Sequence, residues 1–399
     1  MSDSSLPNAS VEPVRNPVLP RVTIDTDGDL ILKVKAVSYL VGGVTWEHEQ
    51  EFLVDSHAMR CASPVWKSML FLGWAESKPS DGSPWVVKLV EEDEVVDELS
   101  ENYLLTGMDI LLHLTHGNVA PLELVINKGL REDLISYRAL CRLRGFLSLC
   151  DKYDTLPLIK YWAEHVWQWR SLPHTIQTFD GHRTLLQVGW ILGNEEVSCS
   201  AFSRIILIST QKDLAIPEFD TNPDLVRGWG IIPKETVEKL YSLRRNRLQD
   251  IIRHFQTYLK ALLEHDPDVC KGPKHQSHLC NDTILAGIIR HHRQMPDRRN
   301  NGDGRCNWKS AYSIVLATDP YLRDINGTRL LSDLFRIDDI QMLEGHDLCC
   351  PAKRFQKAFD DNIRMKGSRG SYRSQMDPEE GEHLLRQREK LEEKYERKR

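Results

Sequence analysis

Several features that define large protein classes are missing from this chain of 399 residues. No apolar run reaches the roughly 18–20 residues that a membrane-spanning helix needs. The chain contains no glycine-rich phosphate-binding loop, no nucleophile elbow and no His-Glu-x-x-His metal motif. We therefore expect that it is not an enzyme. An enzyme whose site carries no such motif is the alternative, and it would show a deep polar pocket with perturbed carboxylates or histidines.

The chain also lacks an excess of positive charge. It has 52 basic and 58 acidic residues, which gives a formal net charge of −6. A chain with this balance has no general electrostatic attraction to nucleic acid. We therefore expect protein partners and no membrane, with nucleic acid disfavoured.

Neither a secretory signal nor a disulfide framework is indicated. The first 20 residues are rich in Ser, Pro and Asn, and they lack a basic start followed by an apolar core. The nine cysteines are an odd number and widely scattered, so reduced thiols in an intracellular location, cytoplasm or nucleus, are expected. We expect residues 1–24 to form a disordered arm.

Hydrophobic periodicity predicts ordered structure after this arm. Alternating apolar residues over 30–36 and 46–54, separated by a Gly-Gly pair, predict a β-hairpin. Helical periodicity follows, and Ser63-Pro64 divides it into two short helices because proline is tolerated only in a first helical turn. Ser63 is expected to cap the second helix.

Further elements follow along the chain. A strand is expected at residues 85–90, and the four acidic residues 91–94 are interpreted as a solvated loop. The C-terminal segment 378–399 is expected to be a solvated charged helix with ion pairs between residues four apart. Other helices are predicted at 108–116, 136–152, 158–169, 183–192, 200–209, 234–264, 281–292, 309–317 and 328–343.

The N-terminal elements, in this order, resemble a BTB/POZ domain of the type abundant in fungal proteins, over about residues 25–168. The motifs that carry the resemblance are DGDLILKV, FLVDSHAMRCASPVWKSML, GWAES, WVVKLVEEDE, ILLHLTHGN and LCDKYD. It implies an α+β fold, with a small sheet capped by a helical cluster. The expected organisation is a disordered arm (1–24), a BTB/POZ-like domain (25–168), a mainly α-helical C-terminal region (171–365) and a charged, partly helical tail (366–399).

The same resemblance implies an adaptor that recruits a partner or dimerises. Many members dock a cullin ubiquitin ligase through an apolar-x-Glu motif after the helix that here begins at Pro64. Trp74 and Glu76 occupy that place, and Trp66 is a further anchor if it is exposed. Packing of Trp74 against the domain core is the alternative. The expected partners are thus a cullin, with the chain as a substrate adaptor of the ligase, or a second BTB protomer.

A structural zinc ion is the one cofactor that the sequence suggests, because thiolates and imidazoles are the ligands zinc prefers. Cys350 could replace Cys349 as a ligand, and His275 or His278 could replace either Cys270 or Cys280. The Cys-x9-Cys spacing is not that of a standard zinc finger, and reduced cysteines packed in a helical core are the alternative. The candidate ligands are Cys270, Cys280, His346 and Cys349.

A gene-regulatory protein with a nucleic-acid-contacting C-terminal region is the alternative function. Residues 290–305 carry several arginines, and Trp308 is the only obvious aromatic platform nearby. This alternative predicts retention on DNA that falls steeply with salt.

Overall fold

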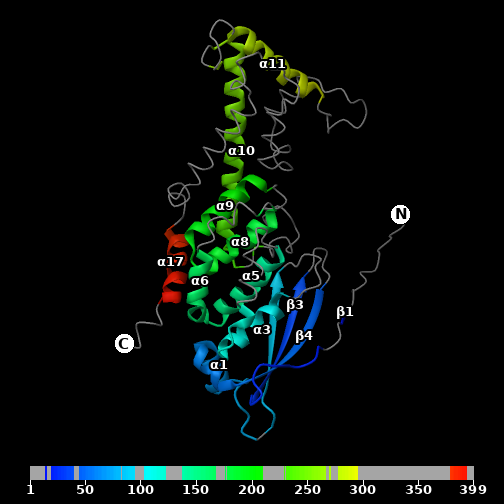
Figure 1. Ribbon diagram of the computed structural model, residues 1–399, viewed down its shortest axis with the longest axis vertical. Helices are drawn as coiled ribbons and strands as arrows, with labels where there is room; N and C mark the ends of the chain where they lie inside the picture. Colours follow the sequence, from blue (N-terminus) through cyan, green and yellow to red (C-terminus); the bar gives the residue numbers. More distant parts are fainter. Residues whose placement is uncertain are drawn as a thin grey trace, which may run out of the picture. The chain divides into compact units, whose positions relative to one another are not determined.

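The chain divides into two compact units. Unit 1 comprises Met1–Ser198, Ile216–Pro233 and Pro378–Arg399, and unit 2 comprises Cys199–Ala215 and Lys234–Asp377. Unit 1 contains a small sheet and several helices, so the expected α+β class is confirmed (Figure 1). The computed structural model describes residues 14–15, 19–39, 45–81, 83–94, 103–122, 137–167, 176, 178–209, 229, 231–266, 269–270, 277–294 and 378–392.

A β-hairpin forms the centre of the sheet in unit 1. β3 (Leu30–Tyr39) and β4 (Thr45–Val54) pair antiparallel, with Leu30 opposite Val54, which confirms the predicted hairpin. β5 (Val86–Glu94) lies parallel to β3 on its other side. The even-numbered apolar residues of β3, Leu30 to Ala36, are buried, because alternate side chains of a strand point to the same face.

The N-terminal arm contributes two short strands to the same sheet. β1 (Val14–Arg15) and β2 (Val22–Thr23) both pair parallel with β4, so the strand order is β1-β4-β3-β5, with β2 off this path. Gln50 on β4 donates a hydrogen bond to the carbonyl of Pro20 at 2.5 Å. The expectation of a disordered arm over 1–24 is therefore wrong for these strands, because the edge of β4 offers backbone partners to segments too short to show a pattern.

Two short helices connect β4 to β5, as predicted. α1 (Ser56–Ala62) is capped by the side chain of Asp55. α2 (Pro64–Phe71) has Pro64 in its first turn, and the Ser63 hydroxyl accepts a hydrogen bond from the Trp66 amide at 3.1 Å. The Ser-Pro pair thus ends one helix and begins the next, as its chemistry requires.

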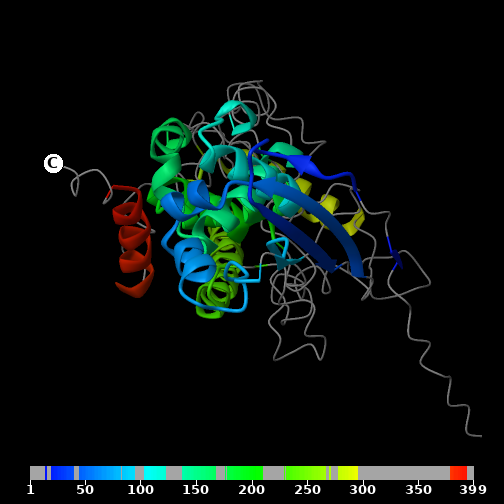
Figure 2. The same ribbon diagram turned by 90° about the horizontal axis from the view of Figure 1, so that it is seen from below.

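The remaining helices of unit 1 gather on one side of the sheet (Figures 1 and 2). The predicted helices are confirmed there within a few residues of their expected ends. The elements are α3 (Tyr103–Thr115), α5 (Tyr137–Lys152), the 3-10 helix η1 (Leu156–Ile159), α6 (Lys160–Trp167), α8 (Phe179–Ile191) and α17 (Pro378–Glu392). The helix α9 (Glu195–Ile208) contains the boundary between the units and lies mostly in unit 2.

Unit 2, as far as the structure describes it, is helical. α10 (Lys234–Leu263) packs against α11 (Ser277–Gln294), and α10 buries Leu240, Leu248 and Phe255 at intervals of seven or eight residues. The helices predicted at 309–317 and 328–343 lie outside the described residues. None of the described helices is long and apolar enough to cross a membrane.

The C-terminal helix α17 is not the solvated helix that the sequence predicts. Leu384 and Leu391, seven residues apart, are 4% and 1% exposed. α17 packs against η1 and α8 in unit 1. The heptad repeat of these leucines is too short to sustain a coiled coil, but it forms a narrow apolar stripe that is enough to dock one face of the helix.

Glu91 corrects a second expectation, because the acidic run belongs to β5 and not to a loop. Its side chain is buried, and it accepts hydrogen bonds from the Tyr153 hydroxyl at 2.5 Å and the Lys152 ammonium at 2.7 Å. The Tyr153 ring lies 5.0 Å from that of Trp66, and the Tyr153 carbonyl accepts a hydrogen bond from Ser63. The LCDKYD motif thus fastens the end of α5 to β5 and to α2.

Replacing Tyr153 with phenylalanine should destabilise this junction. Burial raises the pKa of Tyr153, and the Glu91 carboxylate raises it further, so the hydroxyl stays protonated and donates. Its removal leaves a buried carboxylate short of one donor, which should lower the free energy of unfolding by about 1–3 kcal/mol in urea denaturation. Tyr161→Phe, at an exposed tyrosine, is the matched control. Equal stability of the two variants would contradict this account of Glu91.

Candidate protein-interaction surface

Helix α2 and the turn after it expose four large apolar side chains. Leu72 and Trp74 are 67% and 63% exposed, and Val65 and Phe71 are exposed to a lesser extent. Single exposed apolar residues are normal in soluble proteins, whereas a local group marks a candidate contact for another protein. We call these four residues the docking surface.

Hydrogen bonds hold the turn that carries Trp74. Gly73 has a positive φ of 84°, a conformation that glycine adopts without steric cost, and its amide donates to the Ser77 hydroxyl at 3.0 Å. The Ser77 amide donates to the Trp74 carbonyl at 3.0 Å. The Ser77 hydroxyl also lies 3.4 Å from the Met69 carbonyl in α2. The turn is therefore tied to its own helix, and Trp74 is presented on a fixed backbone.

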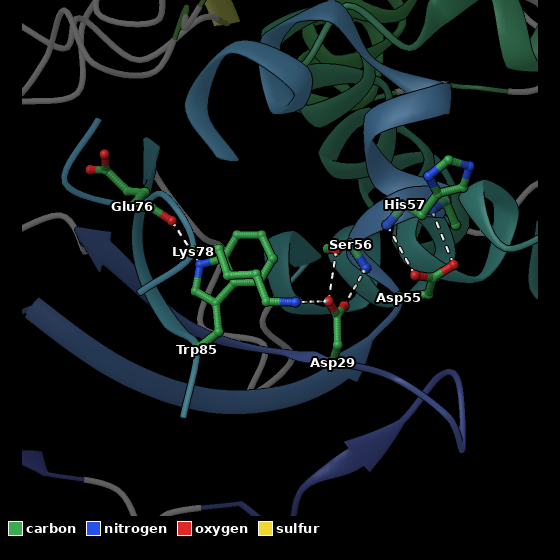
Figure 3. Close-up of polar contacts among 8 residues, drawn as sticks. Asp29, Asp55, Ser56, His57, Glu76, Lys78 and Trp85 are labelled. Atoms are coloured by element: carbon green, nitrogen blue, oxygen red, sulfur yellow. Dashed lines mark hydrogen bonds and ion pairs between the residues drawn. The ribbon is translucent and has the colours of Figure 1, made fainter. Parts of the chain in front are cut away.

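Trp85, just before β5, supports the turn from behind. Its indole N–H donates to the Glu76 carbonyl at 2.8 Å (Figure 3). Its ring meets Phe71 edge to face, with centroids 5.7 Å apart and an interplanar angle of 89°. The Arg60 guanidinium lies over Phe71 and the Lys78 ammonium over Trp85, at 5.1 and 5.6 Å from the ring centroids. The turn is thereby packed on the sheet and on α1.

Asp29 joins the start of β3 to α1 and to the far side of the turn. Its carboxylate accepts hydrogen bonds from the Ser56 amide at 2.9 Å and the Ser56 hydroxyl at 3.0 Å, and the Lys78 ammonium lies 3.3 Å away (Figure 3). Partial burial alone would raise the pKa of Asp29, but these hydrogen bonds outweigh it and lower the pKa. The charged carboxylate therefore stabilises the support of the docking surface.

The three residues that the sequence singled out occupy different environments. Trp74 is exposed, so the alternative of Trp74 packed against the core is wrong. Glu76 is half-buried, and its backbone carbonyl makes the contact with Trp85 while its carboxylate points away from that ring (Figure 3). Trp66 is 0% exposed, and it was expected to contact a partner only if exposed, so it is not part of the surface.

Sequence reasoning missed Phe71 and Leu72 as surface residues. The run Met69-Leu-Phe-Leu72 is more apolar than one face of a short helix can bury. This excess of apolar residues could have indicated a surface contact. In the structure Leu70 is buried, and the neighbouring Phe71 and Leu72 are exposed. The docking surface is therefore broader than the Trp-x-Glu triplet.

The candidate zinc ligands are only partly within the described residues. Cys270 and Cys280 are both buried in unit 2. His278 is exposed on α11, and its ring centroid lies 5.1 Å from that of His265. Over the described ranges, no three or more His, Cys, Asp or Glu side chains are placed to hold a metal ion. The zinc site stays a prediction, since His346 and Cys349, with the alternatives Cys350 and His275, lie outside those ranges.

Asp29→Asn should weaken the support of the turn in a pH-dependent way. The lowered pKa means that Asp29 stabilises the fold above its ordinary value of 3.8 and loses this contribution as the pH falls below it. The side chain is 38% exposed, so solvent screening limits the expected loss at pH 7 to about 1 kcal/mol. Urea unfolding at pH 7, 5 and 3 measures it, with Asp27→Asn in the same turn as control. A wild-type advantage that stays constant down to pH 3 would contradict this role.

The docking surface thus combines exposed aromatic and aliphatic side chains with a backbone that two polar networks immobilise. Comparison of the chain with protein-family models, with curated proteins and with solved structures found no match. The BTB/POZ resemblance therefore stays a prediction from the sequence motifs, and the surface is defined by its own geometry.

Proposed function

We propose that this chain is a protein-interaction adaptor that acts through a BTB/POZ-like domain in unit 1 and contacts its partner through the docking surface. The observation that carries the proposal is the pair Leu72 and Trp74, each more than 60% exposed on a turn with a fixed backbone. Large rigid anchors of this kind contribute most of the binding energy at protein interfaces, because little conformational entropy is lost when they are buried.

The order of elements in unit 1 supports the BTB/POZ part of the proposal. A hairpin, β3 and β4, is followed by the helix pair α1 and α2 and then by a strand parallel to β3. A helical cluster follows β5 in the sequence. A small sheet with a helical cap is what the resemblance implies, and this order of elements supports our inference that the docking surface corresponds to the apolar-x-Glu motif of that family.

The chemistry around the docking surface indicates what the partner must offer. The Arg60 guanidinium lies over Phe71, and Lys67 is an exposed residue of α2. Glu76 follows Trp74 by two residues in the turn. A partner with an apolar pocket and a mainly acidic rim is complementary to this arrangement. The N-terminal domain of a BTB-binding cullin is the partner that we propose, which makes the chain a substrate adaptor whose helical unit 2 is available to a second protein.

Calorimetry with that cullin domain tests the proposal directly. The full chain should bind with micromolar or tighter affinity. Trp74→Ala should weaken binding at least tenfold, because truncation of an interface anchor typically costs about 2 kcal/mol or more. The double variant Trp74→Ala, Glu76→Lys should abolish it. Val90→Ala, at an exposed valine of β5, is the matched control and should bind as the wild type does.

Absence of binding by the wild type would remove the cullin as the partner. Self-association, measured by sedimentation over a range of concentrations, then tests a second copy of the chain against the same docking surface. If Trp74→Ala changes neither cullin binding nor self-association, the docking surface serves neither partner, and the adaptor proposal fails in this form.

A further inference from the structure

The C-terminal helix α17 belongs to unit 1 but is far in sequence from the other helices of that unit. The sequence stretch 295–377 separates it from α11, the preceding described helix. The His383 ring stacks on the Trp190 ring of α8, with centroids 4.6 Å apart and an interplanar angle of 20°. Leu384 and Leu391 complete its buried face. α17, drawn in red in Figure 1, lies beside the green helices of unit 1.

Unit 1 is shaped to receive the backbone of this helix. Gly193, directly after the end of α8, has a positive φ of 62°. A Cβ atom built at this position would lie 2.7 Å from the Arg388 amide nitrogen and even closer to the Leu384 carbonyl oxygen. Only glycine allows so close an approach, so the segment after α8 lies directly against the backbone of α17.

A single carboxylate anchors the polar side of the interface. Asp151, near the end of α5, accepts a hydrogen bond from the Gln387 amide at 3.1 Å, and the Lys390 ammonium lies 3.3 Å from the same oxygen. Asp151 belongs to the LCDKYD motif, next to the lysine that binds Glu91. Helix docking therefore involves the same segment that closes the core of unit 1.

Two buried polar atoms of this interface, His383 Nε2 and Gln387 Oε1, have no hydrogen-bond partner within the described residues. Such atoms regain water when the helix leaves, which favours the undocked state. The contacts that favour docking are the two buried leucines, the stacked ring and the two polar contacts with Asp151.

We propose that α17 is a releasable intramolecular ligand of unit 1, and that protonation of His383 in mild acid releases it. The neutral ring suits the stack on Trp190, whereas a second N–H on the imidazolium would place a charge at a buried, unpartnered position. This proposal does not rest on the adaptor function.

The charges around His383 oppose one another. Burial lowers the pKa of His383, and Lys390 and Arg386 on α17 lower it further. Asp151 and a hydrogen bond with the Trp190 backbone raise this pKa, and the net effect is a lowering below 6.5. A docked state that binds the proton less well than the free helix is favoured above pH 6.5. It loses that advantage as the pH falls below 6.5, by no more than about tenfold per pH unit.

Hydrogen exchange of the full chain at pH 7.5, 6.5 and 5.5, corrected for the intrinsic pH dependence of amide exchange, tests the proposal. The protection of the α17 amides should fall by up to about tenfold between pH 7.5 and 5.5. Amides of α8 report on unit 1 as a whole and should keep their protection. Loss of protection in both helices together would mean acid unfolding of unit 1 and would overturn the proposal.

Two variants isolate the histidine. His383→Gln and His383→Phe cannot be protonated, and the phenyl ring also preserves the stack on Trp190. Protection of α17 in whichever variant docks at pH 7.5 should be independent of pH, and a pH dependence equal to that of the wild type would overturn the proposal. Gly193→Ala should strip the protection from α17 at every pH, and full protection in that variant would show that docking does not require the close approach at Gly193.

Discussion

Unit 1 depends on a buried negative charge. The Glu91 carboxylate lies in β5 beneath the helical layer, where an unpaired charge would cost several kcal/mol, and Tyr153 and Lys152 of the LCDKYD motif supply its partners. The same tyrosine packs on Trp66, and its carbonyl accepts from Ser63 at the start of α2. Sheet, α5 and α2 are thus joined at one point, and the position of α2 follows from it.

That position decides which side chains of α2 face the solvent. Trp66 and Leu70 point into the core, so Phe71, Leu72 and Trp74 emerge at the end of the helix. An exposed aromatic residue binds a partner more tightly when its backbone is already ordered, because ordering a mobile turn on binding costs free energy. The networks around Trp85 and Asp29 provide this, because they connect the turn to β5, α1 and β3 without covering Trp74.

The segment at the end of α5 that contacts Glu91 also contacts the C-terminal helix α17. Asp151 binds α17, while the adjacent Lys152 binds Glu91. One turn at the end of α5 therefore serves both a fixed junction in the core and a polar contact with a helix from the far end of the chain. Glu91 accepts hydrogen bonds from two close donors in the core, whereas Asp151 lies at the polar side of the α17 interface.

The sequence by itself determined the local elements: the β3–β4 hairpin, the Ser63-Pro64 helix break and the long helix α10 follow from periodicity, capping and proline chemistry, which act within a few residues. Only the tertiary structure decided what each side chain faces. The burial of Glu91, the exposure of Trp74 and the docking of α17 depend on partners up to 239 residues away in the sequence, as in the Asp151–Lys390 pair. No local pattern encodes such contacts, because a charged or aromatic residue looks the same in sequence whether its partner is water or protein.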